Sequence, residues 1–151
     1  MALAWLAGCG QREPSPDVSF TLLDGTRSST GSLRGSVVLM NFWATSCATC
    51  VRKMPLLIQT HNAYRARGFQ TLAVAMQYDP PAVVAHFAEI RALPFGVVID
   101  NTGVIAQRFG DIQVTPTSLL LDRRGGMAYR WVGAPEAADL HARVEHLLAE
   151  E

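Results

Sequence analysis

The sequence predicts an α/β fold in which a mixed sheet is flanked by helices. Apolar runs typical of buried strands alternate with segments whose apolar residues recur at helical spacing. Near the C-terminus, two strand-like runs are separated only by the turn sequence of residues 122–126. This direct succession predicts an antiparallel pair within the alternating pattern. The 151 residues are enough for one domain with its own hydrophobic core.

Composition and charge are those of an ordinary globular domain. Hydrophobic residues make up 49% of the chain and charged residues 17%, and 13 basic residues balance 13 acidic ones. A neutral chain without a basic run argues against nucleic acid or an anionic membrane surface as its main partner. The chain has three cysteines, which are too few for a disulfide-stapled scaffold.

Residues 1–16 predict a leader and spacer ahead of a domain at residues 17–151. The first ten residues are apolar and rich in small side chains, but this run is too short to cross a bilayer as a helix. Residues 6–9, Leu-Ala-Gly-Cys, resemble a bacterial lipoprotein signal, in which the cysteine is lipidated. Cys9 is therefore a candidate for a membrane-tethering lipid anchor. The alternative is a disordered leader with an incidental cysteine.

The first half of the domain predicts a short hairpin, a central strand and a long helix. Residues 18–22 alternate between apolar and polar, as in a half-buried strand, and Asp24–Gly25 is a hairpin turn signal. Residues 37–43 are almost continuously apolar, which predicts a strand covered on both faces. A helix is expected over about residues 47–67, kinked by an internal proline and ended by Gly68.

A second buried strand and a second helix follow. Residues 69–76 form another apolar run, and Asp79 is expected to cap a helix whose first turn contains proline. The apolar positions of this helix predict one buried stripe. The stripe comprises Val83, Val84, Phe87 and Ile90.

The remaining elements are short strands and two helices. Strands are expected at residues 96–99, 118–121 and 127–132, and a short helix at 104–109, closed by glycine. Pro135 and the glutamate after it open the last helix. Its apolar face comprises Leu140, Val144, Leu147 and Leu148.

Cys47 and Cys50 occur where a buried strand turns into a helix. Residues three apart on a helix share a face, with their Cβ atoms about 5–6 Å apart, near the separation that a disulfide needs. Cys47 lies at the helix N-terminus, where unpaired N–H groups and the helix dipole stabilise a thiolate. The spacing predicts that Cys47 attacks a partner disulfide and that Cys50, less exposed, resolves the mixed disulfide.

Two other interpretations of the cysteine pair carry less weight. A structural zinc site needs four ligands, and the chain has no second paired cluster, so no metal site is expected. A disulfide that closes so short a loop removes little entropy from the unfolded chain, so a purely structural bridge here would add little stability.

Three separated motifs resemble the thioredoxin-like proteins, most closely their exported TlpA/ResA/DsbE-type branch. They are residues 41–50 (Asn-Phe-Trp-Ala-Thr-Ser-Cys-Ala-Thr-Cys), Met54–Pro55 and Thr115–Thr117. The resemblance extends over roughly residues 18–148. It implies a thioredoxin-like fold with an N-terminal β-hairpin and a helix–strand insertion over about residues 77–100.

The resemblance also implies roles for matching residues. Cys47 is implied as the attacking thiol and Cys50 as the resolving one. Pro116, implied to follow a cis peptide bond, and Thr115 flank the sulfurs, and the Thr115 backbone could pair with an extended substrate segment. Trp43 is implied to pack beside the site, although a purely structural role in the core fits its position equally well.

Three positions depart from the family pattern. Ser46 stands where the branch often has tryptophan, and Asn41 replaces the buried aspartate of thioredoxins. Lys53 stands where ResA-like members often carry glutamate. A lysine favours a nearby thiolate whereas a carboxylate disfavours it, so we expect a readily ionised Cys47 and a disulfide that is less strongly reducing than in the glutamate-bearing members. The alternative is that Lys53 simply points to solvent.

The resulting prediction is an enzyme that exchanges disulfides with protein thiols outside the cytoplasm, in the periplasm or at a membrane surface. Its only redox group would be the Cys47–Cys50 disulfide, recharged by an upstream membrane electron donor, and the branch implies a use in cytochrome c maturation. A non-catalytic or metal-carrying module tethered by Cys9 is the alternative from another class. A peroxiredoxin-type peroxidase fits poorly, because Ala44 occupies the position of its required threonine.

Overall fold

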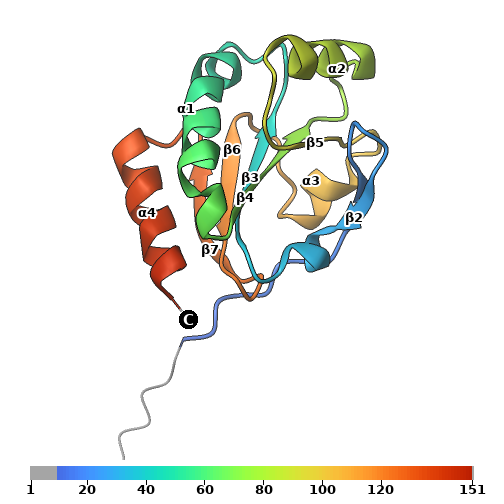
Figure 1. Ribbon diagram of the computed structural model, residues 1–151. Coiled ribbons are helices and arrows are strands. Elements are labelled where there is room, and N and C mark those ends of the chain that lie inside the picture. Colours follow the sequence, from blue (N-terminus) through green and yellow to red (C-terminus); the bar gives the residue numbers. More distant parts are fainter. Residues whose placement is uncertain (1–9, 151) are drawn as a thin grey trace, which may run out of the picture.

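A five-stranded mixed sheet forms the centre of the structure, a computed structural model that describes residues 10–150 (Figure 1). The strand order is β5-β4-β3-β6-β7. β3, β4 and β5 run parallel, while β6 is antiparallel to β3 and to β7. The strands are β3 Val37–Trp43, β4 Phe69–Ala75, β5 Gly96–Ile99, β6 Thr117–Leu121 and β7 Met127–Val132. The predicted mixed sheet is confirmed.

β3 is the central strand and all seven of its residues are buried, as its continuous apolar run predicts. Its register pairs Trp43 with Ala75 of β4 and Phe42 with Thr117 of β6. The C-terminal ends of β3 and β4 therefore meet the start of β6 at one edge of the sheet. The loops that leave this edge build the functional site.

Helices cover both faces of the sheet. α1 (Ala48–Tyr64) and α4 (Ala137–Ala149) lie side by side on one face (Figure 1), and their buried residues share one core cluster. α3 (Val104–Arg108) packs into a second cluster on the other face. All four apolar residues predicted for the last helix are buried, so that amphipathic pattern is confirmed.

The N-terminal hairpin covers the same face as α3. It consists of β1 (Ser19–Thr21) and β2 (Arg27–Ser29), followed by the 3-10 helix η1 (Thr30–Leu33). Phe20 of β1 belongs to the cluster that also contains the α3 residues. The hairpin predicted from the Asp24–Gly25 turn is thus present.

The predicted long helix is divided near its C-terminal end. α1 ends at Tyr64, and a short 3-10 helix, η2 (Arg65–Arg67), continues it to Gly68. Gly68 takes the left-handed conformation, with φ 86°, which glycine adopts without steric cost. The predicted stop at this glycine is therefore confirmed.

Two expectations for the second helix are wrong. α2 spans Pro81–Ile90 and its N-cap is Pro80, which makes no side-chain capping bond, so Asp79 does not cap it. Of the predicted stripe only Val84 is fully buried, whereas Val83 is 47% and Ile90 61% exposed. Phe87 is partly buried against the core, so α2 is covered along the line of Val84 and Phe87, while Val83 and Ile90 face solvent.

The last residues of the expected spacer pack onto the domain. The Ser15 amide donates to the Gly125 carbonyl at 2.8 Å, and Arg12 forms ion pairs with Asp122 and Glu150. The segment just before residue 17 is therefore attached to the turn between β6 and β7 and to the end of α4. Cys9 lies outside the described residues. Across residues 10–150, no helix combines the length and the apolar character needed to cross a membrane.

Candidate active site

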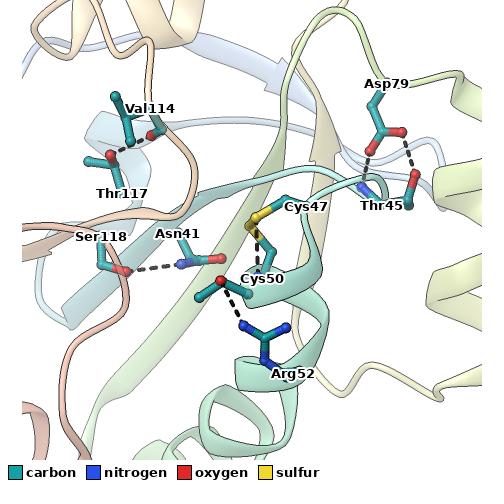
Figure 2. The surroundings of a disulfide bond; sticks show 10 residues. Asn41, Thr45, Cys47, Cys50, Arg52, Asp79, Val114, Thr117 and Ser118 are labelled. Atoms are coloured by element: carbon teal, nitrogen blue, oxygen red, sulfur yellow. Dashed lines mark hydrogen bonds between the residues drawn. A yellow bond between two sulfur atoms is a disulfide. The ribbon is translucent and has the colours of Figure 1, made fainter.

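Cys47 and Cys50 form a disulfide at the start of α1 (Figure 2). Their Cα atoms are 5.2 Å apart. Cys47 is the N-cap residue of the helix, and its Sγ accepts a hydrogen bond from the Cys50 amide at 3.2 Å. Cys47 is half-buried while Cys50 is only 3% exposed. The pair is therefore asymmetric, with one sulfur accessible and hydrogen-bonded and the other enclosed.

The loop between β3 and α1 sets the direction in which Cys47 points. β3 ends at Trp43, and the Cys47 amide then donates to the Ala44 carbonyl at 3.1 Å, closing a tight turn. The Val51 amide donates to the Cys47 carbonyl at 3.1 Å, which starts the helical bonds. The Cys50 N–H, in the first helical turn, thus points at the Cys47 sulfur, where it favours a thiolate.

The segment before β6 lies at the same edge of the sheet as the cysteines. Because Thr117 pairs with Phe42, residues 114–116 lie beside the end of β3. The Thr115–Pro116 peptide bond is cis. Pro116 is buried, and its carbonyl accepts from the Gly133 amide at 2.8 Å. Val114, at the rim of this segment, is 53% exposed.

Trp43 lies below the active-site loop within the core. It is fully buried, and its ring packs against Phe87 of α2 with the centroids 5.1 Å apart. Its indole N–H has no hydrogen-bond partner among the described residues. These contacts join the end of β3 to α2.

Asn41 is buried next to the site and is hydrogen-bonded. Its Nδ2 donates to the Ser118 Oγ of β6 at 2.9 Å, as Figure 2 shows. An amide in this buried place has a neutral partner and cannot accept a proton as a carboxylate does. The aspartate-to-asparagine departure therefore removes an ionisable group from beneath the cysteines.

Lys53 is half-buried on the first turns of α1. Within residues 10–150, it takes part in none of the ion pairs. Its neighbour Arg52 donates to the Thr49 Oγ1 at 3.0 Å. The N-terminal part of α1 thus carries two cationic side chains and no acidic residue in its first turn.

Asp79 belongs to the surroundings of the site, a role that its assignment as a helix cap missed. It is 3% exposed, and its Oδ2 accepts from the Thr45 amide at 2.7 Å. Its Oδ1 accepts from the Thr45 hydroxyl. One signal for this placement is present in the sequence. β3 and β4 were both predicted as buried strands, and the carboxyl ends of neighbouring parallel strands meet at one edge of a sheet.

The metal-carrying alternative finds no support in the described part of the chain. Residues 10–150 contain no group of three or more histidine, cysteine, aspartate or glutamate side chains arranged to hold a metal ion. The two cysteines are bonded to each other. The geometry therefore favours redox chemistry at this pair.

Solved structures of related proteins share the fold over most of the chain. A protein of Neisseria meningitidis, solved in solution, is 38% identical with a TM-score of 0.83, and the match covers 88% of each chain. A thiol:disulfide interchange protein of the thioredoxin family from Chlorobium tepidum is 26% identical with a TM-score of 0.84. That match covers 93% of this chain and 99% of the other. The fold is thioredoxin-like, as the motifs imply.

Sequence comparison points to the same group of proteins. The thiol-disulfide oxidoreductase ResA of Geobacillus thermodenitrificans is 33% identical over 96 residues, which cover 64% of this chain and 55% of the relative. The chain thus spans about half the length of the curated relatives it matches. The family model described as Redoxin matches residues 11–145, nearly the whole described domain with its cysteine pair. On this match, the chain belongs to the Redoxin family.

Proposed function

We propose that the protein catalyses thiol–disulfide exchange with protein thiols through Cys47 and Cys50. The observation that carries the proposal is the asymmetry of the pair. Cys47 is accessible and its sulfur accepts a helix N-terminal N–H, while Cys50 is enclosed one turn further along. An accessible thiolate attacks and a protected thiol resolves, which is the division of labour that such exchange requires. Similarity to thiol-disulfide oxidoreductases supports the same chemistry.

The exchange proceeds in two steps. In the reduced protein the Cys47 thiolate attacks one sulfur of a substrate disulfide, forming a mixed disulfide and releasing the other substrate sulfur as a thiolate. The Cys50 thiolate then attacks the Cys47 sulfur and releases the second substrate thiolate. Two electrons pass from the protein to the substrate, and the Cys47–Cys50 disulfide forms. The reverse sequence oxidises a substrate dithiol, and neither direction needs another cofactor.

Serine substitutions test the assignment of the two cysteines. Cys47→Ser should abolish reduction of a protein disulfide such as that of insulin. Cys50→Ser should instead accumulate a mixed disulfide between Cys47 and the substrate, visible by non-reducing electrophoresis and mass spectrometry. A Cys50→Ser protein that forms no such adduct, together with an inactive wild type, would contradict the proposal.

The direction of electron flow is decided by the reduction potential of the pair. We propose a potential above that of thioredoxin, because Lys53 and the neutral Asn41 both favour the reduced, thiolate-bearing form. Equilibration with glutathione and dithiothreitol standards measures it. A value near about −270 mV would make the protein a reductant like thioredoxin, and a value nearer about −120 mV an oxidant like DsbA.

We further propose that the protein works outside the cytoplasm, where disulfide exchange with exported proteins takes place. A membrane electron donor would recharge it, and apocytochrome c cysteines are the proposed substrate, in keeping with the resemblance of the motifs to the exported TlpA/ResA/DsbE-type branch. Reduction of a disulfide-bonded Cys-x-x-Cys-His peptide, faster than that of a scrambled control, tests the substrate. Incorporation of labelled palmitate into the expressed chain, absent in Cys9→Ser, tests the lipid anchor.

A further inference from the structure

The loop that carries Cys47 is tied to the loop between β4 and α2 by a buried carboxylate. Asp79 accepts hydrogen bonds from both the amide and the hydroxyl of Thr45, two residues before Cys47. Figure 2 shows both bonds, on the opposite side of the disulfide from Ser118. With 3% of its surface exposed, the carboxylate has little access to water. Its stability in this place therefore depends on these two donors.

Backbone bonds fix the carboxylate to the rigid end of β4. The Met76 amide donates to the Trp43 carbonyl at 3.0 Å, and the Asp79 amide donates to the Met76 carbonyl at 2.9 Å. These backbone bonds alone hold Asp79 near the end of β3. Its side chain adds two hydrogen bonds to Thr45, and so connects the sheet to the residues directly preceding Cys47.

We infer that Asp79 is a positioning residue that holds Cys47 in place for disulfide exchange, an inference that rests on the proposed function. The Cys47 sulfur reaches the Cys50 amide only while the turn from Ala44 to Cys47 keeps its shape. Since Thr45 lies within this turn, the two bonds to Asp79 limit its movement. We call these two Asp79–Thr45 hydrogen bonds the clamp. The clamp keeps the Cys50 N–H in reach of the Cys47 sulfur, where it stabilises the thiolate.

The charge of Asp79 acts in the opposite sense to its hydrogen bonds. A carboxylate near Cys47 disfavours the thiolate, whereas the clamp favours it. Asparagine removes the charge and keeps an oxygen acceptor for Thr45, while alanine removes both. Comparison of Asp79→Asn with Asp79→Ala therefore isolates the clamp, with the cationic Arg52 and Lys53 of α1 unchanged in both variants.

The pH profile of Cys47 alkylation by iodoacetamide in the reduced protein is the direct measurement. Weakening the hydrogen bond from the Cys50 amide to the Cys47 sulfur should raise the pKa of Cys47 by about one unit. We expect this rise in Asp79→Ala relative to Asp79→Asn, seen as about tenfold slower alkylation below the pKa. Thr45→Val removes one of the two bonds without removing the charge, and should raise the pKa relative to Thr45→Ser.

Asp100 provides a matched control. It is 2% exposed and accepts from the Ile105 and Ala106 amides at 3.1 and 2.9 Å. These residues belong to the core cluster on the opposite face of the sheet from α1. Asp100→Ala should lower the unfolding temperature but leave the alkylation profile of Cys47 unchanged, which separates positioning from general destabilisation.

The outcomes distinguish the inference from the proposed function. Equal alkylation profiles for Asp79→Ala and Asp79→Asn would overturn the clamp, as would a shift of the same size in Asp100→Ala. If Asp79→Ala does not fold, the same decision rests on Thr45→Val against Thr45→Ser. Alkylation is read at Cys47 by peptide mass spectrometry, which separates it from Cys9 and Cys50, and it needs no disulfide substrate. A wild type unable to reduce insulin would therefore refute the proposed function while leaving this comparison valid.

Discussion

The two cysteines differ because one helical turn separates them. Cys47 precedes the first residue of α1 and remains accessible, whereas Cys50 faces the core cluster shared by α1 and α4. Substitutions of nearby residues should therefore change the reactivity of Cys47 mainly by changing its pKa. Lys53 and Asp79 carry opposite charges near the same end of the helix, and each gives a separate measurement.

Lys53→Ala should raise the pKa of Cys47, because it removes a cation from the start of α1. For a partly exposed charge the effect is small, roughly half a pKa unit. Alkylation rate against pH measures it in the reduced protein. Lys53→Arg keeps the charge and should leave the profile unchanged. If Lys53→Ala also leaves it unchanged, the lysine serves only as a solvated surface residue.

His61 should make the protein less stable in mild acid. It is buried, and this burial, together with the nearby charge of Arg65, lowers its pKa in the folded state. The unfolded chain, with a histidine pKa of about 6.5, then binds more protons than the folded one. The free energy of unfolding therefore falls as the pH decreases below this value. Urea unfolding between pH 8 and pH 5 measures the loss.

A matched pair of substitutions separates His61 from the other histidines. His61→Gln cannot be protonated and should reduce the acid-induced loss of unfolding free energy. His86 is exposed on α2, so His86→Gln should leave the pH dependence as it is in the wild type. Equal slopes in the two variants would show that the acid sensitivity has another source.

At the scale of elements, α2 shows how little of a helix needs to be buried. Val84 is fully buried in the cluster below α1, whereas Val83 is 47% exposed. Val84→Ala should lower the free energy of unfolding by about 2 kcal/mol through lost apolar contact and a residual cavity. Val83→Ala should change it by less than about 0.5 kcal/mol. Chemical denaturation of both variants tests the assignment, and equal losses would contradict it.

At the scale of the whole molecule, Arg12 joins segments from both ends of the chain. Its guanidinium binds both carboxylate oxygens of Glu150 at 2.7 Å and also Asp122 at 3.0 Å. Arg12→Ala should lower the free energy of unfolding by about 1 kcal/mol, because the pair is bidentate and partly shielded. Arg67 and Glu145 form a pair that is also bidentate but about half exposed on each side. Arg67→Ala is therefore the control, and an equal loss there would argue against a special role for Arg12.

Local patterns determined most of the architecture and the central chemistry. The continuous apolar run of residues 37–43 predicts a strand covered on both faces, and β3 is fully buried at the centre of the sheet. The spacing of Cys47 and Cys50 predicts a disulfide at a helix start, which the structure contains. These predictions succeed because strand burial and helical spacing are properties of neighbouring residues in the chain.

Tertiary structure alone decided which distant residues meet at the site. Asp79 precedes two prolines and has the local signature of a helix cap, yet its carboxylate binds Thr45, 34 positions earlier in the chain. Val83 and Ile90 fit an amphipathic stripe, yet α2 leaves both exposed. The physical reason is the same in both cases. Periodicity along the chain describes one element at a time. The register of β3 against β4, and the choice of which α2 residues are covered, arise only when elements pack together.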